Sequence, residues 1–279
     1  MATRALRAAV ARPDVAVNAI RRAQAVMVLL PGGCDKAEKK AKARLRTALR
    51  RVRKRQDRDA LDRLIRDLLE SDRQAKQTLL ALRSDEAEDE DPTRARYRRK
   101  DTAALQAAAR AFATLTEAYR EAARKTPPPP ELLIERATAL TKKRAVALTR
   151  AMLDAGSVYS ADRLRLPRRL LRKLRTAAEL LKDLGGIVTA ANLRAFDRTL
   201  LALDRIRDLQ RLINRVRKAQ GALSPAALHA WHELDLTIIA IEHRCRRQHA
   251  RYVRECPALL TLCESWEALP AATGRPQAG

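Results

Sequence analysis

The chain has 279 residues, of which 3% are aromatic and only 8 are glycine, and its 58 Lys and Arg against 33 Asp and Glu give a formal net charge of +25. So few aromatic residues and glycines exclude a mainly β fold, and the abundance of alanine, leucine and arginine predicts an all-α protein. This charge weakens a compact fold unless anions offset it, so it predicts a polyanionic partner: nucleic acid, a phosphate polymer or an anionic membrane surface.

The first part of the chain is predicted to hold four helices after a short basic lead. The lead, residues 1–12, is expected to be disordered. Apolar spacing predicts helices over residues 13–30, 35–55, 58–82 and 93–125. The acidic run 84–91 has no apolar anchors, so we expect it to form a flexible loop.

Four consecutive prolines, at positions 127–130, predict a stiff connector between a first helical half, residues 13–126, and a second half, residues 131–268. Helices are then predicted over residues 131–154 and 165–184. A strongly periodic helix follows and closes at Gly221, and a final helix after Ser224-Pro225 is predicted to run to about Glu255. The remainder, residues 269–279, is expected to be disordered.

The stretch 165–181 has the clearest division into two faces. At about 100° per residue, Arg165, Arg168, Arg172 and Arg175 fall on one side of a helix, with Arg169 and Lys173 beside them. Leucine and alanine occupy the opposite side. The pattern predicts a helix that packs into a bundle by one face and presents a ladder of cations on the other.

The two halves repeat the same order of features at an offset of about 150 residues. Each half has a basic amphipathic helix, a break that contains glycine, and a second helix that ends in an acidic residue, Asp57 or Asp208. This repetition predicts a duplicated antiparallel helical bundle, in which two four-helix-like halves are related by a pseudo-twofold axis. The two basic helices would then face each other across a central groove.

These motifs resemble those of the conserved histidine α-helical domain (CHAD) family, over about residues 13–265. Its repeated basic helix has the form H-x-x-R-[KR]-x-x-[KR]-[KR]-L-R, which Arg165 to Arg175 matches except at the histidine. The family's next helix ends in Leu-Gly-x-x-[RH]-Asp, which Leu203 to Asp208 matches with Asp204 in place of glycine. Residues 44–57 are similar to the first-half counterpart. Asn18 and Arg165 stand where the family has its two name-giving histidines.

The resemblance implies non-catalytic binding of inorganic polyphosphate and association with polyphosphate granules. A ladder of guanidinium groups on stiff helices suits a flexible polyanion, since each contact is a charge-assisted hydrogen bond and binding releases counterions. Asp57 and Asp208 are expected to have a structural role, pairing with neighbouring arginines. The predicted polyphosphate-binding residues are Arg21, Arg22, Lys40, Arg44, Arg51, Arg165, Arg168, Arg169, Arg172, Lys173 and Arg175.

Two other functions stay open on the sequence. A helical protein that binds nucleic acid through the phosphate backbone is the main alternative, although proteins that bind single strands usually place aromatic side chains among their basic residues, which no basic stretch does here. The other alternative is an interaction scaffold whose charge serves solubility alone.

No signature of catalysis or of a cofactor is legible in the sequence, so we predict a binding module and not an enzyme. There is no glycine-rich phosphate loop and no nucleophile motif. His229 and His232 have a spacing that can hold a metal on a helix, but no carboxylate–histidine pattern accompanies them, and the four cysteines match no zinc spacing. We expect no metal, no transmembrane segment and a reduced, cytoplasmic setting.

Overall fold

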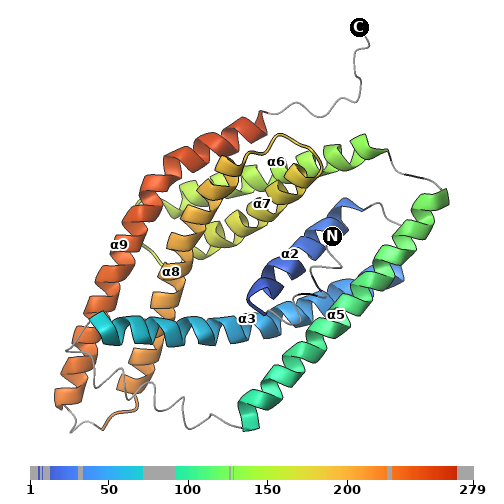
Figure 1. Cartoon of the computed structure of the whole chain (residues 1–279). Coiled ribbons are helices and arrows are strands. Elements are labelled where there is room, and N and C mark those ends of the chain that lie inside the picture. Colours follow the sequence, from blue (N-terminus) through green and yellow to red (C-terminus); the bar gives the residue numbers. More distant parts are fainter. Residues whose placement is uncertain are drawn as a thin grey trace.

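A computed structural model describes residues 13–30, 34–71, 92–125, 129–224 and 228–268, together with positions 6, 8 and 127. Within these residues the chain forms helices and no strand, so the predicted all-α fold is confirmed (Figure 1). Its duplication about a pseudo-twofold axis stays a prediction. The helices are α2 (Pro13–Leu29), α3 (Asp35–Ser71), α5 (Pro92–Lys125), α6 (Pro130–Ala155), α7 (Arg165–Asp183), α8 (Ala190–Gln220) and α9 (Leu228–Glu267).

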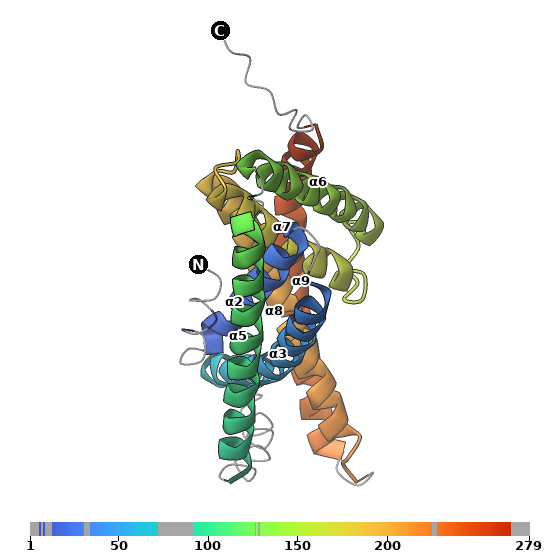
Figure 2. The same ribbon diagram turned by 90° about the vertical axis from the view of Figure 1, so that its right-hand side faces the viewer.

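The helices pack in two groups that contact each other through α2 and α3. In one group α8 packs against α9 and α6 against α7, and in the other α3 packs against α2 and α5. Helix α2 also packs against α7, and α3 against α8. Figure 1 shows α5 and α9 at opposite edges of the molecule with α2 between them, and Figure 2 places α5 in front of α2 and α3. The predicted boundary at the prolines coincides with the link between α5 and α6.

Three clusters of buried apolar side chains form the interior. The first lies among α6, α7, α8 and α9 and also receives Ala25 and Leu29 from α2. The second lies among α2, α3 and α5 and includes Leu6, which belongs to the lead that was expected to be disordered. The third joins Leu61 and Ile65 of α3 to α8 and α9. Helices α2 and α3 of the first half therefore bury side chains both among the helices of their own half and against helices of the second half.

The predicted break in the second helix is wrong, because α3 continues through residues 55–58 without interruption. This stretch contains neither glycine nor proline, so its backbone has no local reason to leave the helix. Its side chains also favour continuity, since Asp57 ion-pairs with two arginines of α8. The sequence interpretation treated Asp57 as a terminus, whereas it lies inside a helix of 37 residues.

The predicted end of the last helix near Glu255 is also wrong, because α9 continues through Pro257 to Glu267. An internal proline removes a hydrogen bond and costs a helix about 3 kcal/mol. Beyond it, Leu259, Cys263 and Trp266 are buried in the first cluster. Burying large apolar side chains of this kind contributes about 2 kcal/mol each, which offsets the cost of the proline.

The other helix ends agree with the sequence signals. Pro130 occupies the first turn of α6, where its missing N–H costs nothing, and Gly156 ends that helix with a φ of 68°. A capping box opens α8: the Asn192 backbone N–H donates to Thr189 Oγ1 at 3.2 Å, and the Thr189 N–H donates to Asn192 Oδ1 at 2.9 Å. These caps fix where α7 and α8 begin to run beside each other.

Three predicted segments lie wholly or mainly outside the described residues. They are the acidic run 84–91, the C-terminal residues 269–279, and the lead 1–12 apart from positions 6 and 8. Among the residues that are described, every helix is too polar or too short in its apolar stretches to cross a lipid bilayer.

Candidate anion-binding site

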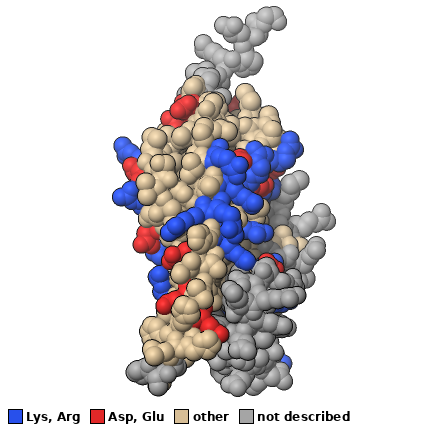
Figure 3. Space-filling model, turned by 90° about the vertical axis from the view of Figure 1, so that its left-hand side faces the viewer, with Lys and Arg blue, Asp and Glu red and all other residues tan. Residues whose placement is uncertain are grey.

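A cavity of about 970 Å³ opens between α2, α3, α7 and α8, with one side chain from α6 at its wall. Twelve Lys and Arg line it against three Asp, and we call this cavity the basic groove. Lys and Arg side chains also gather near the middle of the molecular face shown in Figure 3. The cationic lining residues are Arg21, Lys42, Arg46, Arg53, Arg144, Arg165, Arg168, Arg169, Arg172, Lys173, Arg175 and Arg207.

Helix α7 supplies half of these cations because its two faces differ. Leu171, Leu174 and Leu181 are buried in the first cluster, which turns the arginine ladder towards α2 and α3. Helix α2, whose Arg21 also lines the groove, packs directly against α7. The structure therefore brings the two basic helices together, as the sequence predicted.

Each of the four ladder arginines forms an ion pair with a carboxylate. Arg168 Nε donates to Asp204 Oδ1 at 2.5 Å, and Arg172 donates to the same oxygen. Arg175 pairs with Asp197 at 2.5 Å and with Glu179 at 2.8 Å. At the exposed start of the helix, Arg165 pairs with Asp162 at 3.0 Å.

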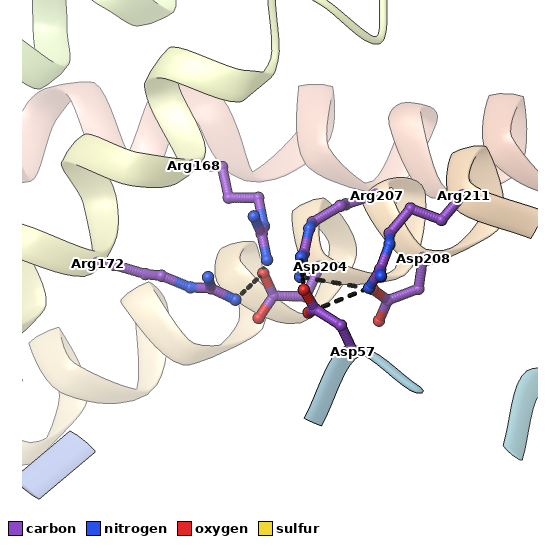
Figure 4. Close-up of polar contacts among 7 residues, drawn as sticks. All are labelled: Asp57, Arg168, Arg172, Asp204, Arg207, Asp208 and Arg211. Carbon is purple, nitrogen blue, oxygen red and sulfur yellow. Dashed lines mark hydrogen bonds and ion pairs between the residues drawn. The ribbon is translucent and has the colours of Figure 1, made fainter. Parts of the chain in front are cut away.

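An arginine–aspartate cluster of seven residues lies beside the basic groove (Figure 4). Five of its members line both the groove and a second cavity of about 590 Å³. Asp57 of α3 pairs with Arg207 at 2.6 Å and with Arg211 at 3.1 Å. Asp208 lies 3.7 Å from Arg207. The cluster thus links α3 to α8, and α8 to α7, by charge. Its members are Asp57, Arg168, Arg172, Asp204, Arg207, Asp208 and Arg211.

The pKa values of two carboxylates in this cluster are shifted in opposite directions. Burial by itself would raise the pKa of Asp204, but the charges and hydrogen bonds of Arg172 and Arg168 outweigh it and hold that pKa below its usual range. Burial raises the pKa of Asp208, and the charges of Arg207 and Arg168 offset this only in part. Asp204 is therefore a firmly ionised counterion in the groove wall. The expected structural role of Asp57 and Asp208 stays a prediction.

Within the described part of the chain, six of the twelve groove cations contact no carboxylate. They are Arg21, Arg46, Arg53, Arg144, Arg169 and Lys173. Arg144 donates instead to the Lys173 carbonyl at 2.6 Å. The groove therefore keeps a large excess of positive charge after its internal ion pairs are counted.

Arg21 and Arg53 are the most crowded of these six cations. Burial, followed by the charges of Arg172 and Arg53, lowers the pKa of Arg21 to about 9. Desolvation, followed by the charges of Arg172 and Arg207, lowers the pKa of Arg53 as well. Three guanidinium groups from α2, α3 and α7 repel one another here. The charge of Asp204 relieves the repulsion at Arg21, and the charges of Asp57 and Asp204 relieve it at Arg53.

Seven of the eleven residues predicted to bind polyphosphate line the groove, namely Arg21, Arg165, Arg168, Arg169, Arg172, Lys173 and Arg175. Four others do not. Arg22 pairs with Asp183, while Lys40, Arg44 and Arg51 lie on the flank of α3 that faces away from the groove. At 100° per residue, these three stand about 180° around α3 from Lys42, Arg46 and Arg53, which do line it.

The sequence interpretation missed Lys42, Arg46, Arg53, Arg144 and Arg207. The apolar seam of α3 is bordered by basic residues on both flanks, so its sequence cannot indicate which flank faces α7. Arg144 belongs to a basic run of α6 without a motif. Arg207 carried the one available signal, because it occupies the basic position of the motif that ends in Asp208.

The histidines and cysteines lie apart from the groove. His229 pairs with Glu233 at 3.6 Å on α9, and His232 is exposed. Among the described residues, no three His, Cys, Asp or Glu side chains lie close enough to hold a metal ion. All four cysteines are free thiols.

Comparison with protein-family models, curated proteins and solved structures finds no match to this chain. The resemblance to the CHAD family therefore stays a prediction from the motifs.

Proposed function

We propose that the basic groove binds an extended chain of inorganic polyphosphate without catalysis. The observation that carries this proposal is the set of six cations without carboxylate partners that α2, α3, α6 and α7 direct into one cavity. Each of the other six groove cations forms an ion pair with a carboxylate, which these six lack among the described residues. A ligand with closely spaced negative charges would complete their coordination.

Energetics favour a multivalent anion over a single phosphate. The chain carries a formal charge of +25, and burial, together with the nearby charges of Arg172 and Arg53, lowers the pKa of Arg21 to about 9. An anion that contacts Arg21 and Arg53 together relieves this repulsion and forms charge-assisted hydrogen bonds. A polymer also releases the counterions condensed along its length, which adds a favourable entropy term at low salt.

The lining of the groove favours a polymer without bases. No aromatic side chain is found among the described residues that line it, so it offers no surface on which nucleobases could stack. The arginines present planar, two-pronged donors that suit phosphate oxygens. Polyphosphate matches this chemistry because every unit of the polymer offers phosphate oxygens and nothing else.

The motif resemblance supports the same ligand independently. The stretch that matches the CHAD basic helix, Arg165 to Arg175, forms α7 and supplies half of the groove's cations. On this basis we propose a cytoplasmic protein that associates with polyphosphate granules. The absence of both name-giving histidines makes it a divergent member of the family.

A competition assay tests the proposal. Labelled polyphosphate is bound to the full chain and displaced by unlabelled polyphosphate, single-stranded DNA or duplex DNA at equal phosphate concentration, over several salt concentrations. Polyphosphate is expected to displace the label at the lowest phosphate concentration. Stronger displacement by DNA would establish the nucleic-acid alternative, and no binding at physiological salt would leave a scaffold protein.

A further inference from the structure

Asp204 occupies an unusual place, since a carboxylate lies in the middle of a surface that otherwise collects cations. Its Oδ1 accepts from Arg168 Nε at 2.5 Å and also from Arg172 (Figure 4). The three side chains are partly shielded from solvent, with exposed fractions of 33% for Asp204, 15% for Arg168 and 19% for Arg172. They line both the basic groove and the second cavity.

The influence of Asp204 reaches beyond its two direct partners. Its charge favours the protonated forms of Arg21 on α2 and of Arg53 on α3. Arg168 Nη2 is buried and has no hydrogen-bond partner among the described residues, so one donor of that guanidinium is still unsatisfied. One carboxylate thus offsets four neighbouring guanidinium groups from three helices.

We propose that Asp204 is an internal counterion that competes with the bound polyanion for Arg168 and Arg172. In the free protein it holds the two arginines and stabilises the crowded groove. When a phosphate approaches, the same carboxylate repels it and already occupies the donors that the phosphate would use. Asp204 therefore lowers the affinity for the ligand while it stabilises the free fold. This inference rests on the proposed function of the groove.

The opposite role for Asp204 would be that of a positioning residue, which orients the two arginines for the ligand. The two roles predict opposite signs. Removal of a competitor strengthens binding, whereas removal of a positioning group weakens it. Geometry favours competition, because the carboxylate binds Nε of Arg168 and a terminal nitrogen of Arg172. These are donors that a phosphate needs.

The test compares Asp204→Asn with Asp197→Asn. Both changes are isosteric and remove one negative charge from the groove lining on the same helix. Asp197 is a matched control because it pairs with Arg175 alone and is half exposed. Asp204→Asn is expected to bind polyphosphate about tenfold more tightly, because one repulsive charge near the ligand is removed in a partly desolvated site. Asp197→Asn is expected to change affinity by about threefold at most, because exposed charges are screened.

Two further readouts separate competition from a general change of charge. The slope of log K against log salt should steepen by about 0.7 for Asp204→Asn, as one more cation becomes available to the polymer. In a background that carries Arg168→Gln and Arg172→Gln, the gain from Asp204→Asn should vanish, since the two effects act through the same pair. Unchanged or weaker binding by a folded Asp204→Asn protein would overturn the proposal.

A second measurement covers loss of folding and failure of the proposed function. If Asp204→Asn does not fold, wild type is compared with Arg21→Gln and Arg168→Gln. The unpaired Arg21 should cost about tenfold in polyphosphate affinity and the Asp204-paired Arg168 about threefold, and equal losses would refute competition. If Asp204→Asn folds, the melting temperatures of wild type and of Asp204→Asn are measured at increasing concentrations of inorganic sulfate. If wild type binds no polyphosphate but sulfate stabilises Asp204→Asn more than wild type, the proposed function fails and the counterion role stands. Equal stabilisation overturns the counterion role.

Discussion

The sharpest consequence of the groove is that two pairs of arginines with equal charge should behave differently. Arg21 and Arg53 line the groove and contact no carboxylate among the described residues. Arg22 and Arg44 lie on the same two helices, but Arg22 pairs with Asp183 and Arg44 faces solvent on the far flank of α3. Each double variant to glutamine removes two charges from the same segments of the chain.

The expected magnitude follows from the two guanidinium groups that the groove variant removes. A charge-assisted hydrogen bond in a partly desolvated groove contributes about 1 to 1.5 kcal/mol, so Arg21→Gln with Arg53→Gln should weaken polyphosphate binding by about 2 to 3 kcal/mol, or roughly 30- to 150-fold. The salt slope should fall by about 1.4. The Arg22→Gln and Arg44→Gln control should lose about threefold or less, through long-range electrostatics alone.

The stability of the free protein provides an independent test of the repulsion in the groove. Because Arg21 and Arg53 repel their neighbours, removing both charges should leave the melting temperature of the free protein unchanged or raise it by about 2 °C. Fluorescence anisotropy at several salt concentrations and thermal melts of both double variants supply the data. Equal losses of affinity in the two double variants would refute the reasoning, because binding would then follow total charge and not the groove.

Three further predictions concern the fold that holds the groove. Asp57→Asn should lower the free energy of unfolding by about 2 kcal/mol in chemical denaturation, because it removes the carboxylate that pairs with Arg207 and Arg211. The control Asp59→Asn, at an exposed position of α3, should lower it by less than about 0.5 kcal/mol. Equal effects would contradict the role of Asp57 in linking α3 to α8. Burial lowers the pKa of His249, so the folded state binds this proton less readily than the unfolded state and stability should fall as the pH drops below about 6.5. Melts between pH 8 and 5.5 should show this decline in wild type and a smaller one in His249→Gln, and parallel curves would refute it. Trp266→Ala, which removes an edge-to-face contact with Phe196 at 5.4 Å, should cost about 3 kcal/mol in the same denaturation assay, and a loss below about 1 kcal/mol would show that α9 is not anchored beyond its proline.

Apolar periodicity and helix-end signals predicted most of the fold. The boundaries of α2, α5, α6 and α7 agree with the sequence to within a few residues, because prolines and glycines mark their ends. Periodicity failed where no such signal exists. Residues 55–58 separate two apolar patterns that belong to one helix, since the partner of α3 changes along its length from α2 and α5 to α8 and α9. The apolar pattern of α3 therefore changes where its packing partners change, although its backbone stays helical throughout.

Pro257 shows the opposite failure, in which a local signal was present and tertiary packing overrode it. A proline normally predicts a helix end, and the sequence interpretation ended α9 two residues before it. The apolar residues beyond it, Leu259, Cys263 and Trp266, have a surface to cover on the first cluster. Their burial keeps the chain helical, and nothing in the local sequence reveals that surface.

The sequence predicted which residues of α7 line the groove, but it could not predict which flank of α3 does so. Helix α7 has one apolar face, so its arginines can point in one direction only. Helix α3 has a narrow apolar seam with cations on both sides, Lys40 and Arg44 on one flank and Lys42 and Arg46 on the other. Which flank faces the groove depends on the side from which α7 approaches, and that is a property of the assembled fold.

The arginine–aspartate cluster connects the stability of the fold to its proposed ligand. Asp57 joins α3 to α8 and Asp204 joins α8 to α7, so the walls of the groove are held by the same charges that the ligand would meet. A polyanion that binds only the folded state must stabilise it by mass action, by about 2.7 kcal/mol at a hundredfold excess over Kd. Because these walls separate when the chain unfolds, the gain in melting temperature should fall by about two thirds or more in the Arg21→Gln and Arg53→Gln variant and persist in the Arg22→Gln and Arg44→Gln control. Equal stabilisation of both by polyphosphate would place the ligand outside the groove.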